Sequence, residues 1–146
     1  ARFSRKAWLP ERPPIGFGNS GANIRLFRYS DLLLIAAEAA NEIGNQSQAL
    51  NYLNQVRARA RQGNSSILPD VTTTNQTELR QAIWRERRVE LAMEQHRYFD
   101  IVRQGRAQQI YQNLGITWVP GKHEVFPIPQ AEIDISGGTL LQNPGY

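Results

Sequence analysis

The chain has 146 residues, of which 40 % are hydrophobic and 21 % charged, and its formal net charge is +4. This composition is typical of a folded globular domain and excludes a disordered chain. Its longest strongly apolar run, residues 32–40, is far shorter than the ~20 residues that a membrane-spanning helix needs. Because there is no cysteine, disulfides and thiolate metal sites are excluded as well.

The basic residues are almost all arginine, since Lys6 and Lys122 are the only lysines. The planar guanidinium group binds both oxygens of a carboxylate at once, so arginine is the better partner for acidic side chains. The small positive excess is only a weak indication of an anionic partner.

Residues 1–25 show neither a helical nor a strand pattern and are rich in proline and glycine. We interpret them as an irregular loop segment that continues a missing upstream part, because the chain begins with Ala1 and no signal segment follows. A G-x-G-x-x-G run at residues 16–21 is not flanked by a strand and a helix start, so it does not predict a dinucleotide site.

Two helices are predicted at residues 30–43 and 47–62, where apolar residues recur at helical spacing. Ser30 and Asp31 offer an N-cap for the first helix, and a Gly-Asn step ends it. Because only a short turn joins the two helices, we expect them to pack antiparallel. The pair resembles one tetratricopeptide repeat, and a single pair of this kind cannot bury its own apolar face.

A third helix is predicted after Asn75, which forms a capping-box pattern with the glutamate three residues later. The apolar spacing favours a helix over residues 77–95. More helix is expected through Leu114, after a bend near His96 or Gly105.

The predicted fold is therefore mostly α: a tetratricopeptide-like helical repeat with irregular extended segments at both ends. Three regions are expected, namely the loop 1–25, a helical region 26–114 and a proline-rich extended tail 115–146 that packs on the helices. Prolines restrict the tail backbone to extended conformations. Within the tail, residues 130–135 are predicted to form a short helical turn.

Four charged residues in the third helical stretch, Glu86, Glu90, Arg97 and Asp100, share a face with apolar residues at 100° per residue. A pair of carboxylates can serve acid–base hydrolysis, but that chemistry needs a cleft, and the sequence marks none. We therefore interpret the four residues as a partly buried structural ion-pair network, with opposite charge supplied by neighbouring arginines or across the fold. No catalytic residue is assigned.

Tryptophans are the aromatic platforms on which a sugar could stack. Trp84 lies on a predicted helix and is expected in the core, whereas Trp8 and Trp118 lie in loop-like segments. Those two are ligand-binding candidates, with packing as the alternative for each. The histidines, His96 and His123, lack metal-ligand spacing, so the sequence predicts no metal site and no cofactor.

Three stretches match the pattern of one known family. Residues 28–39 (RYSDLLLIAAEA) are similar to its RYADVLLMYAEA helix, and residues 86–105 to its ERRxELxxExxRxxDLxRxG helix. Residues 122–130 (KHEVFPIPQ) and the terminal QNPGY are similar to its closing segment. Order and spacing agree, so the chain resembles the C-terminal part of a SusD/RagB-type outer-membrane nutrient-binding lipoprotein.

This resemblance implies non-enzymatic binding of an oligosaccharide, a polysaccharide or another nutrient, and its delivery to a TonB-dependent, SusC-like transporter. It implies a place on the extracellular face of the outer membrane, held by a lipid anchor outside this chain. It also implies four tetratricopeptide-like helix pairs, of which this chain would supply the last one or two. The family's ligand-binding residues lie mostly upstream, so no ligand contact is transferred to this chain.

A second hypothesis is a helical-repeat interaction scaffold that binds an acidic protein or nucleic acid through an arginine-rich surface. Arg57, Arg59 and Arg61 cluster near a predicted helix C-terminus, where cations are also favourable without any partner. Salt dependence and cellular location would separate the two hypotheses. The family resemblance favours the first, in which nucleic acid is not a partner.

Overall fold

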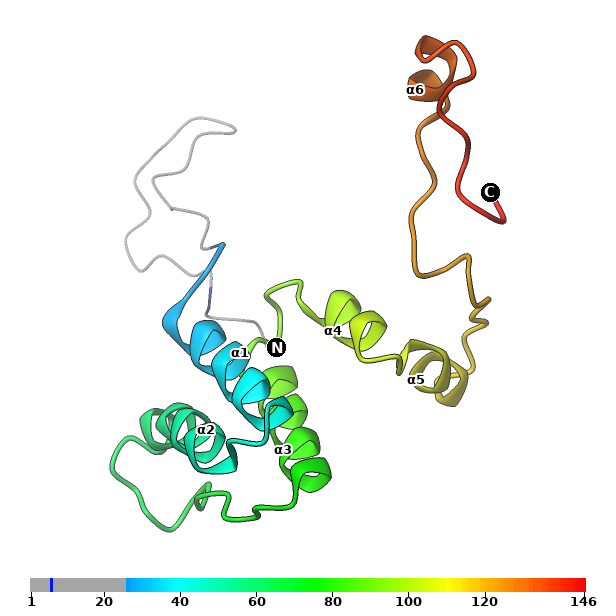
Figure 1. The fold of residues 1–146 in the computed structure, drawn as a ribbon. Coiled ribbons are helices and arrows are strands. Elements are labelled where there is room, and N and C mark those ends of the chain that lie inside the picture. The colour runs from blue at the N-terminus through cyan, green and yellow to red at the C-terminus, as the bar shows by residue number, and fades with distance from the viewer. Residues whose placement is uncertain (1–5, 7–25) are drawn as a thin grey trace, which may run out of the picture. The chain divides into compact units, whose positions relative to one another are not determined.

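A computed structural model describes the protein at residue 6 and over residues 26–146. These described residues form six α-helices and no β-strand (Figure 1), which confirms the predicted mostly α class. Two compact units are present, residues 1–95 and 96–146, and they divide inside the region 26–114 that the sequence suggested as one. The helices are α1 (Tyr29–Glu42), α2 (Gln46–Arg61), α3 (Gln76–Glu90), α4 (Arg97–Arg103), α5 (Ala107–Asn113) and α6 (Gln130–Ile135).

A three-residue turn joins α1 and α2 into the predicted helix pair. Gly44 in this turn has a left-handed φ of 82°, a conformation that glycine adopts without steric cost. The following Asn45 caps α2, because its side chain accepts a hydrogen bond from Gln48 N at 3.2 Å. The Gly-Asn step thus ends one helix and starts the next.

The start of α1 differs from the prediction. The helix begins at Tyr29 and has no side-chain N-cap hydrogen bond, although Ser30 and Asp31 suggested one. The Asp31 side chain is instead buried, and it accepts a hydrogen bond from Arg87 of α3 at 2.8 Å. A contact between helices therefore uses the carboxylate that the local pattern assigned to capping.

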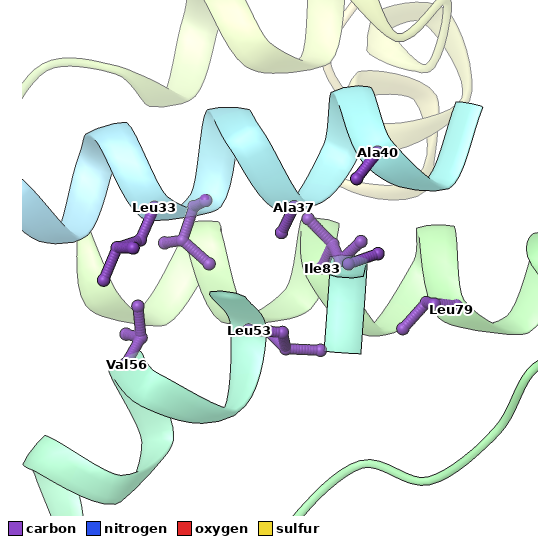
Figure 2. Packing of buried hydrophobic residues seen from close by; sticks show 9 residues of the cluster. Leu33, Ala37, Ala40, Leu53, Val56, Leu79 and Ile83 are labelled. Carbon is purple, nitrogen blue, oxygen red and sulfur yellow. The ribbon is translucent and has the colours of Figure 1, made fainter. Parts of the chain in front are cut away.

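The hydrophobic core of the first unit lies where α1, α2 and α3 meet, and Figure 2 shows its side chains pointing toward one another. Core positions within each helix are spaced mostly three or four residues apart, so they share one face. Burial of each large side chain stabilises the fold by about 1.5–3 kcal/mol relative to exposure. The cluster comprises Leu33, Leu34, Ala37 and Ala40 of α1, Ala49, Leu53 and Val56 of α2, and Leu79 and Ile83 of α3.

The loop between α2 and α3 is held against α2 by side chains of that helix. Asn54 pairs twice with Val71: its Nδ2 donates to the Val71 carbonyl and its Oδ1 accepts from Val71 N, both at 2.9 Å. One turn farther along, Arg57 donates from Nε and Nη2 to the Pro69 carbonyl at 3.0 and 2.8 Å. Residues three apart lie on the same helix face, so the two side chains fix residues 69–71 together.

The beginning of α3 confirms the predicted cap at Asn75. Its side chain accepts hydrogen bonds from Thr77 N at 3.0 Å and from Glu78 N at 3.1 Å. The Glu78 carboxylate does not return to the cap residue as in a full capping box; it accepts from Thr73 Oγ1 at 2.6 Å. The loop before α3 is thereby tied into the first turn of the helix.

The end of α3 corrects the prediction, because the helix stops at Glu90 rather than near residue 95. Turns follow, in which Met93 and Gln95 have left-handed φ values of 67° and 65°. Such values are uncommon for residues other than glycine, and no glycine or proline in the sequence marks this stop. The helix end instead receives hydrogen bonds from two residues distant in the chain, Lys6 and Arg28.

In the second unit, the helix expected to continue through Leu114 is divided into α4 and α5. Gly105 lies between them with a left-handed φ of 66°, at one of the two positions suggested for a bend. Buried Ile101, Ala107 and Trp118 form the core of this unit. α6 confirms the short helical turn predicted in the tail. Among the described helices, none combines the length and apolar character needed to span a membrane.

Candidate functional site

Polar pairs join α1 to α3 beside the apolar core. In each pair a donor on α3 hydrogen-bonds to a carboxylate on α1. The residue numbers rise along α1 as they fall along α3, so the two helices run antiparallel. The pairs are Asp31 with Arg87 (2.8 Å), Glu38 with Trp84 (2.9 Å) and Glu42 with Arg80 (2.6 Å).

The first and last of these pairs differ in burial. The side chains of Asp31 and Arg87 are only 3 % and 5 % exposed, so their mutual attraction helps to offset the lost hydration of each charge. Glu42 and Arg80 lie at the surface. There the hydrogen bond from Arg80 lowers the pKa of Glu42 below its ordinary value.

Glu86, one of the residues in the predicted network, is buried on α3 and pairs with α2. Arg57 Nη1 donates to Glu86 Oε2 at 2.6 Å. The same guanidinium group also holds the Pro69 carbonyl. Arg57 therefore connects α2, the α2–α3 loop and α3 through one side chain.

Arg28, the residue before α1, is the centre of a second polar group, called here the Arg28 cluster: Arg28, Lys6, Ser30, Glu90 and Glu94. Its Nε and Nη2 donate to the two carboxylate oxygens of Glu94 at 2.6 and 2.8 Å. Nη1 donates to Ser30 Oγ and Glu90 Oε1, and Nη2 also donates to the Glu90 carbonyl at 2.6 Å. These five bonds match the five N–H donors of a guanidinium group.

Lys6 binds the same end of α3. Its Nζ donates to the Glu90 and Ala92 carbonyls at 2.6 and 2.7 Å and to Glu94 Oε1 at 2.6 Å. Carbonyls at a helix C-terminus lack partners within the helix, and the helix dipole is negative there. The side chains of Lys6 and Arg28 supply hydrogen bonds and positive charge at this point, which gives a physical reason for the stop at Glu90.

Arg28 and Glu94 stay charged across the physiological pH range. Burial alone would raise the pKa of Glu94, but hydrogen bonds from Arg28 and Lys6 outweigh this effect and lower the pKa to about 2. The hydrogen bond to Glu94 in turn raises the pKa of Arg28. The Arg28–Glu94 pair is therefore suited to fixing backbone segments rather than to exchanging protons.

Two glutamates of the predicted ion-pair network, Glu86 and Glu90, pair with arginines from different elements. For the two glutamates the partners are not the neighbouring arginines of the same helix, because they come from α2 and from the residue before α1. Sequence reasoning missed both partners, and the only signal for Arg28 was its place at the head of the first family-like stretch. The structure pairs Glu86 with Arg57, Glu90 with Arg28 and Asp100 with Arg103 (2.9 Å), and places Arg97 half-buried at the start of α4.

These carboxylates are arranged to link helices. A carboxyl group that acts as a general acid needs a raised pKa, whereas Glu42 and Glu94 both have lowered pKa values. Glu86 and Glu90 each pair with an arginine. In the described part of the chain, no group of three or more His, Cys, Asp or Glu side chains is placed to hold a metal ion.

Trp118, a ligand candidate from the sequence, lies in the core of the second unit and is 8 % exposed. Its ring stacks on Tyr111 of α5, with 5.1 Å between centroids and 9° between planes. His123 makes an edge contact with the ring at 5.4 Å, and the indole Nε1 donates to Glu124 Oε1 at 3.2 Å. These contacts match the packing alternative for Trp118, and its role as a ligand contact stays a prediction.

The other two tryptophans have different outcomes. Trp8, the second ligand candidate, lies outside the described residues. Trp84, expected in the core, is half-buried. Its indole N–H bonds to Glu38, so the ring sits at the edge of the α1–α3 contact with its polar atom satisfied.

Comparison with known proteins identifies the family. The chain matches the model of the SusD family over residues 9–146. SusD-like protein P2 of Formosa agariphila is 36 % identical over 140 residues, which cover 88 % of this chain and 28 % of that protein. SusD-like protein P38 of the same organism is 44 % identical over 92 residues, covering 60 % of this chain and 18 % of that protein.

Solved structures give the same result. A laminarin binding SusD-like protein aligns with a TM-score of 0.67 and 35 % identity, covering 86 % of this chain and 23 % of its own. Surface glycan-binding protein A from Bacteroides thetaiotaomicron aligns with a TM-score of 0.68 and 34 % identity, covering 86 % and 26 %. The chain thus spans about a quarter of the length of these relatives. Over nearly its whole length, this chain belongs to the SusD family.

Proposed function

We propose that this chain is part of a non-enzymatic protein that binds an oligosaccharide or polysaccharide at the cell surface. One observation carries the proposal: the chain is 34–35 % identical, over 86 % of its length, to a laminarin binding protein and to a surface glycan-binding protein. The charge-paired carboxylates of α3 support a role without catalysis, because arginines hold them in contacts between elements.

The proposal extends to location and partner. We infer that the protein is held on the extracellular face of the outer membrane by a lipid anchor outside this chain. There it delivers glycan to a TonB-dependent, SusC-like transporter. Membership of the SusD family supports both inferences.

Within that protein, the segment acts mainly as a scaffold. A second apolar face runs along α1 to its C-cap, since Leu32, Ile35 and the C-cap Ile43 are 51 %, 43 % and 82 % exposed. With Ala39 these residues are spaced three, four and four apart, which suits packing against another helix. In a helical-repeat protein, each pair buries such a face against its neighbour. Helices from the remaining three quarters of the protein would cover this face, and ligand contacts would lie in that part.

The rival function, binding of nucleic acid or an acidic protein, receives less support. It requires an arginine surface that is free to bind phosphate or carboxylate groups. Many arginines of the first unit are instead paired with carboxylates of the same chain. These pairs are Arg28 with Glu90 and Glu94, Arg57 with Glu86, Arg61 with Asp70, Arg80 with Glu42 and Arg87 with Asp31.

Calorimetric titration of the protein that contains this segment, with laminarin, an α-glucan and a charged polysaccharide as probes, tests glycan binding. We expect saturable binding of at least one probe and no release of reducing sugar on prolonged incubation. Release of sugar that disappears on Glu86→Gln or Glu90→Gln would contradict the non-enzymatic proposal. Binding of DNA but of no polysaccharide would favour the rival function.

The transporter proposal needs its own test. A tagged form of the protein, purified from detergent-solubilised outer membranes, should carry a TonB-dependent transporter with it. Recovery of the tagged protein from the periplasm, without any outer-membrane transporter, would contradict both the proposed location and the proposed partner.

A further inference from the structure

The C-terminal residues 142–146 (QNPGY) bind the extended segment 125–128 through side chains rather than through a strand ladder. Each contact joins a side chain of the first stretch to a backbone group of the second. Gln142 Oε1 accepts from Ile128 N (2.8 Å), Gln142 Nε2 donates to Ile128 O (2.9 Å), Asn143 Nδ2 donates to Phe126 O (2.6 Å) and Tyr146 Oη donates to Val125 O (3.1 Å).

The prolines explain why side chains, rather than backbone groups, form these hydrogen bonds. An antiparallel ladder needs both N–H and C=O groups along each strand, but Pro127 and Pro129 have no N–H. Ile128 is the one residue of 127–129 that retains both groups. The primary amide of Gln142 offers one donor and one acceptor to it, as a peptide group would, and so reproduces the paired hydrogen bonds of a single sheet residue.

We propose that Gln142, Asn143 and Tyr146 form a C-terminal clamp that closes residues 128–142 into a fixed strap. Two further contacts hold the clamp residues in place. Gln142 Oε1 also accepts from Asn143 N at 2.9 Å. The Lys122 Nζ lies 4.6 Å from the centre of the Tyr146 ring, a geometry in which a cation attracts the ring face.

The clamp also explains why the short segment α6, which lies inside the strap, forms a helix. α6 has six residues, no side-chain N-cap hydrogen bond and no buried residue. A helix this short is not stable on its own in water. Because the clamp pairs both ends of residues 128–142, it reduces the conformational freedom of the strap and so favours the helical turn.

Hydrogen–deuterium exchange on the intact protein tests the clamp. Within residues 126–129 only Phe126 and Ile128 carry an amide hydrogen, so a peptide from this region reports on very few sites. Gln142→Ala should speed exchange at Ile128 by about tenfold or more, the effect of losing two hydrogen bonds. Exchange in α6 should rise with it, while α4 should be unchanged.

Two further variants make the test specific. Gln142→Glu retains an acceptor for the Ile128 N–H but cannot donate to its carbonyl, so its exchange rate should fall between those of Gln142→Ala and the parent protein. Gln109→Ala, an exposed change in α5, should leave Ile128 unaffected. Unchanged exchange at Ile128 in Gln142→Ala, or equal acceleration in α4, would overturn the clamp. Neither readout depends on glycan binding.

Discussion

Arg28 and Glu94 form a bidentate ion pair, in which Arg28 Nε lies 2.6 Å from Glu94 Oε2 and Arg28 Nη2 lies 2.8 Å from Glu94 Oε1. The two residues are 66 positions apart in the chain. Their contact ties the residue before α1 to the turn that follows α3. The end of α3 is therefore determined by partners that no local window of sequence contains.

Replacement of Arg28 by lysine should destabilise the protein although the charge is kept. Lysine has three donors on one nitrogen and cannot reproduce the planar fork that binds both Glu94 oxygens. We expect Arg28→Lys to lower the free energy of unfolding by ~1.5–3 kcal/mol, the range for hydrogen bonds to charged groups. Urea melts measure the change, with Arg59→Lys on the exposed side of α2 as the matched control. An equal loss of unfolding free energy in Arg28→Lys and Arg59→Lys would contradict a special role for the bidentate guanidinium group of Arg28.

Glu94 should make a contribution to stability that depends on pH in a defined direction. Its pKa is about 2 in the folded protein and 4.5 ordinarily. A lowered carboxyl pKa stabilises the fold above pH 4.5, and this stabilisation is lost as the pH falls toward 2. The stability gap between the parent protein and Glu94→Gln should therefore be full at pH 6 and narrower at pH 3. Denaturant melts at pH 6 and pH 3, with Glu132→Gln on α6 as a control, measure this difference. A difference in the free energy of unfolding that grows toward pH 3 would contradict a lowered pKa for Glu94.

Local signals in the sequence predicted the helices well. They predicted poorly those helix ends that depend on contacts with distant residues. The Gly-Asn step and the cap at Asn75 are short-range features, and both appear in the structure. The stop at Glu90 was missed because the apolar pattern runs on past it, while the residues that bind the helix end, Lys6 and Arg28, lie more than 60 positions away.

The same distinction applies to the candidate site. Helical geometry put Glu86 and Glu90 on a face with apolar residues, and that much followed from spacing alone. The identity of their partners did not, because any of 15 arginines, the 17 basic residues less two lysines, could reach them in some fold. Packing was the alternative given for Trp118, but its stacking partner, Tyr111 of α5, did not follow from spacing alone.

Removal of one partner from a buried ion pair should cost far more than the same change at the surface. Asp31→Ala leaves the buried Arg87 charge without this carboxylate, and we expect a loss of ~3–5 kcal/mol. Glu42→Ala breaks the surface pair with Arg80 and should cost much less, because water screens the attraction between exposed charges. Both variants keep α1 intact as a helix, because alanine is the best helix former. Similar midpoints in urea for the two variants would argue against the burial of the Asp31 pair.

Trp118 offers a test of packing against ligand binding at one residue. Trp118→Ala removes the ring that stacks on Tyr111 in the core of the second unit, and the cavity should lower stability by ~3–5 kcal/mol. Trp118→Phe retains an aromatic ring against Tyr111, although it loses the hydrogen bond to Glu124, so its loss of stability should be smaller. If Trp118 only packs, the folded fraction of both variants should bind glycan as tightly as the parent protein does. Denaturant melts and calorimetric titrations on the same samples separate the two effects. A variant that stays folded at the parent midpoint but binds glycan many-fold more weakly would show that the ring takes part in recognition.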